Sequence, residues 1–306
     1  MSVVITGSAG IDTVETPVDR RERVMGGSAV YISAAASFFA PAAIVSVVGE
    51  DWPEENTRAL RRHGVDTSAL EVRRGEKTLY WFGRYLGNMD ERETVEIQPN
   101  VCGAGYVPAV PRKYRQDASV VLLGNTSPDI QLAVLDQVPD RALVLADTMN
   151  YYINGERSAL DRLLRRIDAL VLNESELFLL TEENSLPTAI DKVLTLGPKV
   201  LVVKRGTCGA ILAAPNGERA IVPAYPMGRV VDPTGAGDSF LGGLGASLAA
   251  VVGEEELPNA RQWRSALVNA TLIASFCIES FSLERLLTLT KPEFDRRRED
   301  FVRMLS

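Results

Sequence analysis

Short apolar runs alternate with helical patterns along most of this 306-residue chain, and no other feature constrains its fold as strongly. The runs are rich in β-branched residues and are bounded by Gly, Pro or Asp. They cover residues 3–6, 44–48, 120–123, 142–146, 169–172, 200–203 and 210–213, with amphipathic segments at 54–64, 158–167 and 186–196. Strands that are apolar throughout must be buried on both faces. We therefore expect an α/β fold with a mostly parallel central sheet flanked by helices on both faces.

One region breaks this alternation. Residues 77–85 and 93–97 alternate as strands without an intervening helix, and the turn at 87–90 predicts a hairpin. Residues 12–23 form a second hairpin candidate. We expect a small β lid, formed by about residues 12–23 and 72–99, that would exclude water from a reaction site at the sheet edge.

Three aromatic residues in the lid, Trp81, Phe82 and Tyr85, are expected to be exposed and would also suit a homodimer surface. The last part of the chain, residues 263–289, is predicted to be helical. No internal repeat or linker separates a second folding unit, so we expect a single domain over residues 1–306.

Composition narrows the possible partners. The hydrophobic content of 46% and the charged content of 24% are typical of a globular protein. A net charge of −7 argues against nucleic-acid or membrane partners, although a few local cations can still hold a nucleotide. Residues 29–48 are apolar, but Pro41 divides them into a predicted helix and strand. Scattered cysteines and the absence of a signal-peptide pattern predict a cytoplasmic location.

A glycine-rich turn carries the strongest chemical signal. Residues 232–238 read Asp-Pro-Thr-Gly-Ala-Gly-Asp and lead into an apolar helix. The small residues Gly235, Ala236 and Gly237 allow backbone amides to approach a ligand, and a helix N-terminus favours negative charge. Asp238 is then placed to take a proton from an attacking hydroxyl. The pattern predicts phosphoryl transfer to an alcohol, whereas the structural alternative is an ordinary strand–turn–helix connection.

This turn resembles the second signature of the ribokinase-like (PfkB) carbohydrate kinases, Asp-Thr-x-Gly-Ala-Gly-Asp, with Pro233 in place of the first Thr. The resemblance covers essentially the whole chain. It implies a ribokinase-like fold, with ATP and Mg²⁺ as cofactors and Asp238 as the general base. It also implies that Asp232 and nearby carbonyls hold a monovalent cation such as K⁺, as in many relatives.

At the donor end, Asn173-Glu174-Ser175-Glu176 matches the family's Asn-x-x-Glu motif. The resemblance implies that Glu176 positions hydrated Mg²⁺ and that Asn173 lies near the donor phosphates. Acidic residues in the first turn of a helix also have a purely electrostatic explanation. The remaining nucleotide contacts implied by the resemblance are Lys204, Gly206, Gly209 and Asn269.

At the acceptor end, Asp12 follows the first strand and resembles the family's first sugar-contacting loop, and Gly26 and Gly27 match its Gly-Gly element. Tyr31 stands near the position where the family commonly has Asn. Further candidate substrate contacts are Asn125 and Asn150, which follow predicted strands, and Arg84 on the lid, for which Glu91 and Glu93 are alternative partners.

Together these features predict an ATP-dependent kinase that phosphorylates a hydroxyl of a small sugar or polyol. A nucleoside kinase of the adenosine type is one alternative, with Tyr31 or Trp81 stacking on the base. A non-catalytic sugar-binding protein on the same scaffold is another. The joint presence of Asp238, the glycines of the turn and Glu176 weighs against the second alternative.

Overall fold

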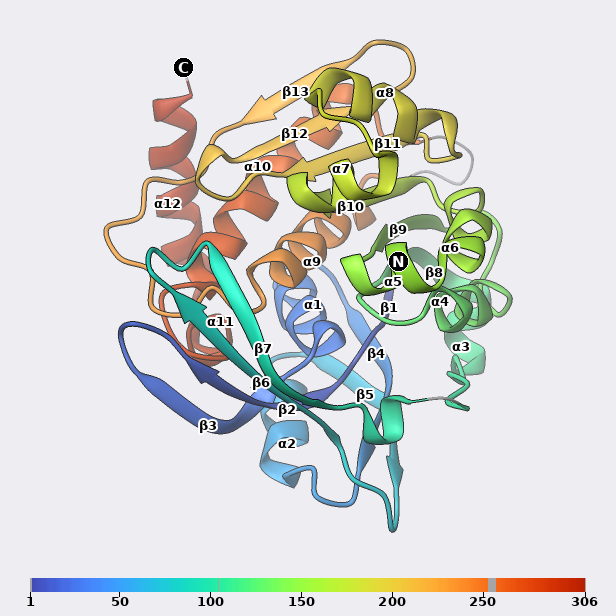
Figure 1. Cartoon of the computed structure of the whole chain (residues 1–306), viewed down its shortest axis with the longest axis vertical. Coiled ribbons are helices and arrows are strands. Elements are labelled where there is room, and N and C mark those ends of the chain that lie inside the picture. The colour runs from blue at the N-terminus through green and yellow to red at the C-terminus, as the bar shows by residue number, and fades with distance from the viewer. Residues whose placement is uncertain (1, 104, 253–256, 306) are drawn as a thin grey trace.

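The computed structural model of the chain describes residues 2–103, 105–252 and 257–305. Its main element is a nine-stranded sheet with the order β13-β12-β11-β10-β9-β8-β1-β4-β5 (Figure 1). The strands from β5 to β11 pair in parallel, and β12 and β13 add an antiparallel edge. These strands are β1 Ser2–Thr6, β4 Ala42–Gly49, β5 Val65–Arg73, β8 Ala118–Leu123, β9 Leu143–Asp147, β10 Ala169–Asn173, β11 Val200–Lys204, β12 Ala210–Ala213 and β13 Arg219–Val222. The predicted mostly parallel sheet is confirmed.

Both faces of this sheet are buried, which explains the continuous apolar runs. In β1, for example, Val3 and Ile5 belong to one core cluster and Val4 belongs to another. The first cluster packs under α1 Ser28–Ser37, α9 Ala236–Ala249, α10 Ala260–Cys277, α11 Glu284–Thr288 and α12 Lys291–Met304. The second packs under α4 Pro128–Leu135, α6 Arg157–Leu164, α7 Glu174–Thr181 and α8 Leu186–Thr195. The remaining helices are α2 Glu54–Arg62, α3 Arg112–Asp117, α5 Asn150–Gly155, η1 Asn100–Cys102 and η2 Gly206–Cys208. None of the helices in these described segments combines the length and the apolar character needed to cross a bilayer.

A second sheet of four strands has the order β3-β2-β6-β7 and lies at the lower left of Figure 1. Its strands are β2 Gly10–Glu15, β3 Arg20–Gly26, β6 Leu79–Leu86 and β7 Glu91–Gln98. Two aromatics that we expected to be exposed there, Phe82 and Tyr85, are instead buried. The guanidinium groups of Arg20 and Arg84 lie over the Phe82 ring, and Tyr85 packs in a small apolar cluster.

The structure differs from the prediction in three other elements. Strands β5 and β13 were not expected. Both are edge strands: β5 mixes polar with apolar residues, and β13 is only four residues long and begins with the exposed Arg219, so neither has the apolar run of the inner strands. The predicted helix over 263–289 was wrong in its continuity, since α10 ends at Cys277 and α11 begins at Glu284. Ser282 lies between them with a φ of 55°, a left-handed conformation that interrupts a helix.

Candidate active site

Two cavities open at the carboxyl ends of the parallel strands, and they meet at Asp238. The first has a volume of about 880 Å³ and is lined by the ends of β9, β10 and β11, the glycine turn and α10. The second has a volume of about 1610 Å³ and lies between α1, α5 and the four-stranded sheet. Six residues line both cavities: Arg92, Asn125, Met149, Asn150, Gly235 and Asp238. We call the first the donor cavity and the second the acceptor cavity.

The glycine turn forms the N-terminus of α9, as the sequence predicts. Gly235 is the N-cap with a φ of 75°, and a Cβ built there would lie 2.2 Å from the ring of Tyr31. Glycine is therefore required at this position for both conformation and space. The amide of Ala236 donates to the carbonyl of Pro233 at 3.2 Å. It is therefore not available to a ligand, contrary to the prediction. In the described part of the chain, the amides of Gly235 and Gly237 have no acceptor and remain available to an anion.

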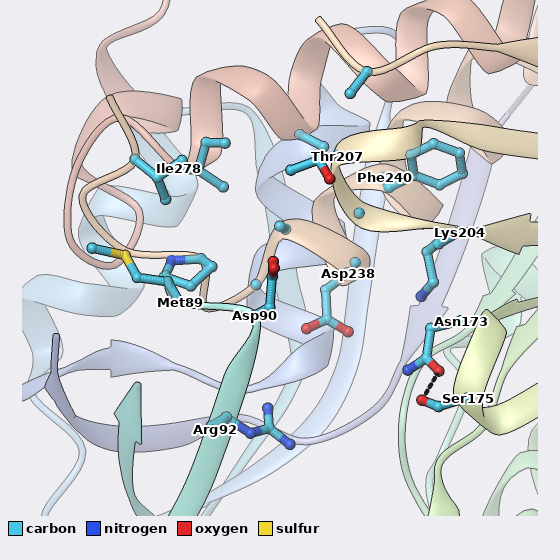
Figure 2. A pocket seen from close by; sticks show the side chains of 18 of the residues that line it. Met89, Asp90, Arg92, Asn173, Ser175, Lys204, Thr207, Asp238, Phe240 and Ile278 are labelled. Carbon is cyan, nitrogen blue, oxygen red and sulfur yellow. Dashed lines mark hydrogen bonds between the residues drawn. The ribbon is translucent and has the colours of Figure 1, made fainter. Parts of the chain in front are cut away.

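Asp238 follows in the first turn of α9, where it lines both cavities and points into the donor cavity (Figure 2). Neither carboxylate oxygen accepts a hydrogen bond from any residue of the described segments. Enclosure by protein, together with the charge of Asp147, raises the pKa of Asp238 to about 7, against the opposing effect of Lys204. A carboxylate with a pKa near neutrality suits general base catalysis at physiological pH.

Asn173 and Glu176 form a reciprocal capping box at the start of α7. The side chain of Asn173 accepts a hydrogen bond from the Glu176 amide at 2.8 Å, and Glu176 Oε2 accepts one from the Asn173 amide at 2.8 Å. These bonds give both residues a structural role as a helix cap, which sequence reasoning did not consider beside the electrostatic explanation. Both residues also line the donor cavity, so the cap does not remove them from the site.

The residues around Glu176 fit a water-held Mg²⁺ better than a directly ligated one. No group of three or more His, Cys, Asp or Glu side chains within the described ranges is arranged to enclose a metal. Glu176 Oε1 takes no hydrogen bond from these residues and remains available to a bound water. Because Mg²⁺ keeps several waters and often takes one or two carboxylates, this single acid is compatible with the prediction.

Lys204 lies in the wall of the donor cavity and pairs with Asp147. Its Nζ is 3.3 Å from Asp147 Oδ2, and both side chains are largely buried. Gly206 and Gly209 follow in the turn after β11 and also line this cavity. Asp147 is a charged site residue that sequence reasoning missed. Its position at the end of β9, beside the end of β10, was the available signal.

Asn269 does not lie in the site, which corrects the expected adenine contact. Its amide hydrogen-bonds to Ser247 Oγ at 3.1 Å, and its oxygen accepts from Arg298 Nε at 3.0 Å, on the side of α10 that faces α12. The residues of this helical region that line the donor cavity are Thr271, Ala274, Ser275 and Ile278. The helix was identified correctly, but the predicted residue lies on the wrong face.

On the acceptor side, Asp12 is buried in β2, and the charge of its carboxylate is costly there. Burial raises its pKa to about 7, and the nearby charge of Asp232 contributes in the same direction. A Cβ on Gly26 would overlap the Asp12 carboxylate, so the first glycine of the Gly-Gly element makes room for this acid. Gly27 and Asp12 both line the acceptor cavity.

Tyr31 and the two predicted asparagines also lie in this part of the site. Tyr31 is 1% exposed, and its hydroxyl has no hydrogen-bond partner among the described residues, although it lines the acceptor cavity. Asn125 Oδ1 is similarly unpartnered, whereas Asn150 Oδ1 accepts from the Tyr151 amide at 2.9 Å. Buried polar atoms without partners are costly, so these two atoms are available to a ligand.

Arg84 faces away from the cavities, and Arg92 occupies the place that we expected Arg84 to fill. Arg84 Nε pairs with Glu15 at 2.8 Å and its Nη1 lies 3.9 Å from Glu93, in line with the alternative role for this side chain. Strand alternation was the signal that we missed. Tyr85 is the cross-strand partner of Arg92, so those two share the cavity face while Arg84 lies on the other.

Asp232 lines neither cavity and instead stabilises the base of the turn. Its two oxygens accept backbone amides from Thr234 at 2.8 Å and from Ser282 at 3.2 Å. These bonds join the glycine turn to the break between α10 and α11. The predicted monovalent-cation site at Asp232 stays a prediction, for which the test is the rate with and without K⁺.

Comparison with known proteins identifies the family. Residues 2–287 match the pfkB family carbohydrate kinases. The chain belongs to this family. A cytidine kinase of Thermococcus kodakarensis is 28% identical over 252 residues, which is 80% of this chain and 87% of that protein. As a pfkB kinase, the chain is a phosphotransferase that acts on an alcohol group.

Solved structures support the same pfkB fold. A Burkholderia thailandensis nucleoside kinase in complex with inosine aligns with a TM-score of 0.75 at 18% identity, over 98% of each chain. An E. coli protein solved with ATP and Mg²⁺ aligns with a TM-score of 0.75 at 22% identity, over 98% of this chain and 99% of that one. At these identities the likeness concerns the fold alone.

Proposed function

We propose that this pfkB kinase transfers the γ-phosphoryl group of ATP to a hydroxyl of a small sugar or polyol, with Asp238 as the general base. The observation that carries the proposal is the position of Asp238, which lines both cavities and takes no hydrogen bond from the described residues. In this proposal the whole chain is one catalytic unit, and the sheet of β2, β3, β6 and β7 is its lid.

The reaction follows from the junction between the cavities. The acceptor hydroxyl lies beside Asp238, which takes its proton as the oxygen attacks the terminal phosphoryl group. The amides of Gly235 and Gly237 hold the transferring group, and Lys204 and Arg92 supply positive charge near it. Glu176 would hold Mg²⁺ through water, and the bound ion would supply positive charge to the donor oxygens.

The first experiment removes the base. Asp238→Asn keeps the shape of the side chain but cannot accept the proton, so kcat should fall by about 10²–10⁴-fold while nucleotide binding persists. Asp191→Asn is the matched control, because this exposed carboxylate pairs with Arg219 on the surface. Steady-state kinetics and calorimetric titration with ADP measure the two properties. An Asp238→Asn enzyme with the turnover of the control would overturn the assignment of the base.

A nucleoside acceptor is the second candidate, and the lining of the acceptor cavity favours it. Ile97, Val107 and Tyr151 line this cavity yet are 56%, 66% and 66% exposed, and Tyr106 and Tyr152 also face it. A small sugar offers little apolar surface to such a wall, whereas a nucleobase can stack on aromatic rings. The cytidine and nucleoside kinases among the compared proteins support this candidate.

An acceptor screen separates the two candidates. The wild-type enzyme is assayed for ADP release with pentoses, hexoses, inositols and nucleosides at equal concentrations. A kcat/KM at least about tenfold higher for a sugar than for any nucleoside supports the sugar, since tenfold corresponds to about 1.4 kcal/mol of transition-state binding. The reverse order supports the nucleoside. ADP release with none of them supports the non-catalytic binding protein.

A further inference from the structure

A buried ammonium–carboxylate pair crosses the end of a strand in the donor cavity. Lys204 ends β11 and Asp147 ends β9, and β10 lies between these two strands. Lys204 Nζ is 3.3 Å from Asp147 Oδ2, and the two side chains are only 18% and 9% exposed. Burying two charges costs free energy that their attraction does not always recover. The pair therefore calls for an explanation beyond stability.

The ammonium group also lies against the glycine turn. A Cβ built on Gly237 would lie 3.0 Å from Lys204 Nζ, so this nitrogen occupies the space directly beside the Gly237 backbone. Gly237 is in the first turn of α9, where the helix dipole presents partial positive charge. A cation is unfavourable at a helix N-terminus unless an anion joins it. The ammonium of Lys204 thus lies beside the turn whose Gly237 amide is free of a protein acceptor among the described residues.

The charged groups around Lys204 keep it positively charged and offer it several acidic partners. The basic side chains among the described residues of the donor cavity are Lys204 at the end of β11 and Arg92 on β7. Asp147, Glu176 and Asp238 all raise the pKa of Lys204, outweighing the opposite effect of its burial, so the lysine is charged. Lys204 could pair with any of these acids, yet it is hydrogen-bonded to Asp147 and leaves Asp238 free.

We propose that Lys204 binds the terminal phosphoryl group of the donor and that Asp147 is a positioning residue, which acts only through Lys204. Asp147 holds the ammonium beside Gly237 and prevents it from pairing with Asp238. This inference rests on the proposed function, because it assigns a partner to the phosphoryl group that is transferred. It adds a role for Asp147 and a reason for the buried pair.

Nucleotide binding without an acceptor tests the contact of Lys204. A non-hydrolysable ATP analogue and ADP are titrated by calorimetry into the wild type and into the variants Lys204→Met and Lys204→Arg. Lys199→Met is the control, because Lys199 is exposed and pairs with Asp168 on the surface. Lys204→Met should lose at least about tenfold in affinity for the analogue and less than twofold for ADP, with partial recovery in Lys204→Arg. Equal losses for both nucleotides would overturn the contact. This readout does not depend on Asp238, so it separates the contact from the proposed base.

A double-mutant cycle tests the positioning role of Asp147. Asp147→Asn should lower kcat by about tenfold and Lys204→Met by about 10²–10³-fold, with the acceptor KM unchanged within twofold. In the Lys204→Met background, Asp147→Asn should change kcat by less than twofold, because Asp147 acts only by holding the ammonium group that this variant lacks. Multiplicative losses in the double variant would overturn this role. The double variant also removes both buried charges together, and thermal unfolding verifies that it folds.

Discussion

Two arginines on the hairpin of β6 and β7 differ in what their side chains can contact. Arg92 lines both cavities, and no acidic group of the described residues lies within salt-bridge distance of it. Its guanidinium lies over the ring of Trp81, with its Cζ 5.2 Å from the ring centre. Arg84 is paired with Glu15 on the opposite face of the strands. In the proposed mechanism, the arginine that can contact the transferring phosphoryl group is therefore the one on β7 and not the one on β6.

We predict that Arg92→Ala lowers kcat/KM by about 10²-fold, within the range seen when one donor to the transition state is removed. Arg84→Ala is the matched control and should retain activity within about threefold, because a partly exposed ion pair contributes little. Steady-state kinetics with the best acceptor of the screen measures both variants. Equal losses in the two variants would show that the hairpin needs both arginines for its structure and that Arg92 has no separate role.

The sequence predicted most of the site residues that follow parallel strands, because parallel strands end at one edge of a sheet. Asn125 and Asn150 were found in this way, whereas Asn173 and Lys204 came from the family resemblance, and all four line the donor cavity. It failed where a side chain had to be assigned to one face of an element. Asn269 lies on the wrong face of α10 and Arg84 on the wrong face of β6, because the partners that define those faces are distant in the sequence.

At the scale of elements, the hairpin is tied directly to the catalytic turn. Tyr85 on β6 and Thr234 in the turn are both buried, and their hydroxyl oxygens are 3.2 Å apart. Tyr85 also packs with Val14 of β2 and Phe281, which precedes α11. One end of the small sheet is thus joined to the turn that carries Asp238 by a buried hydrogen bond and apolar packing.

We predict that Tyr85→Phe weakens this connection without removing the packing. The variant should lose about 1 kcal/mol of stability, because the Thr234 hydroxyl is left buried without its partner. It should also lower kcat/KM for the acceptor by about three- to tenfold, while the affinity for ADP stays unchanged. Chemical denaturation, acceptor kinetics and ADP titration give the three values. If stability falls while acceptor kinetics stay unaltered, the contact between Tyr85 and Thr234 contributes to stability only, and the predicted effect on activity is wrong.

The interrupted helix near the C-terminus shows why some elements could not be predicted. The apolar pattern of residues 263–289 suits one long helix. Ser282 breaks it because its amide bonds to Asp232 and its hydroxyl donates to the carbonyl of Met25 at 2.5 Å. These partners lie 50 and 257 positions away in the sequence, so no local pattern indicates the break. The inner strands could be predicted without knowledge of distant partners, because their continuous apolar residues already indicate burial on both faces.

At the scale of the molecule, the buried acids of the site make stability and activity change in opposite directions as pH rises. Asp12, Glu176 and Asp238 each have a pKa raised to about 7, in every case chiefly by burial. When the chain unfolds, these groups return to ordinary values near 4 and release protons. The folded state therefore binds more protons between about pH 4 and pH 7, and its stability must fall as pH rises through this window.

We predict that the free energy of unfolding decreases from pH 5 to pH 7, while kcat increases over the same range as Asp238 loses its proton. Asp12→Asn should flatten the slope of stability by up to about 1.4 kcal/mol per pH unit, the value for one titrating group. Denaturant titrations at several pH values measure the slope, with Asp191→Asn as the surface control. Identical slopes in the wild type and Asp12→Asn would show that Asp12 titrates normally in the folded chain.

The contact between Tyr31 and Gly235 has a consequence for how this enzyme can change its substrate. The tyrosine ring fills the space beside the catalytic turn, so a replacement at position 31 alters the acceptor wall and the seat of Asp238 together. Ile97, Val107 and Tyr151 line the same cavity but are largely exposed. We therefore expect mutations at this outer rim to alter acceptor recognition more readily than the chemistry. A library restricted to these three positions is the practical starting point for redirecting the enzyme.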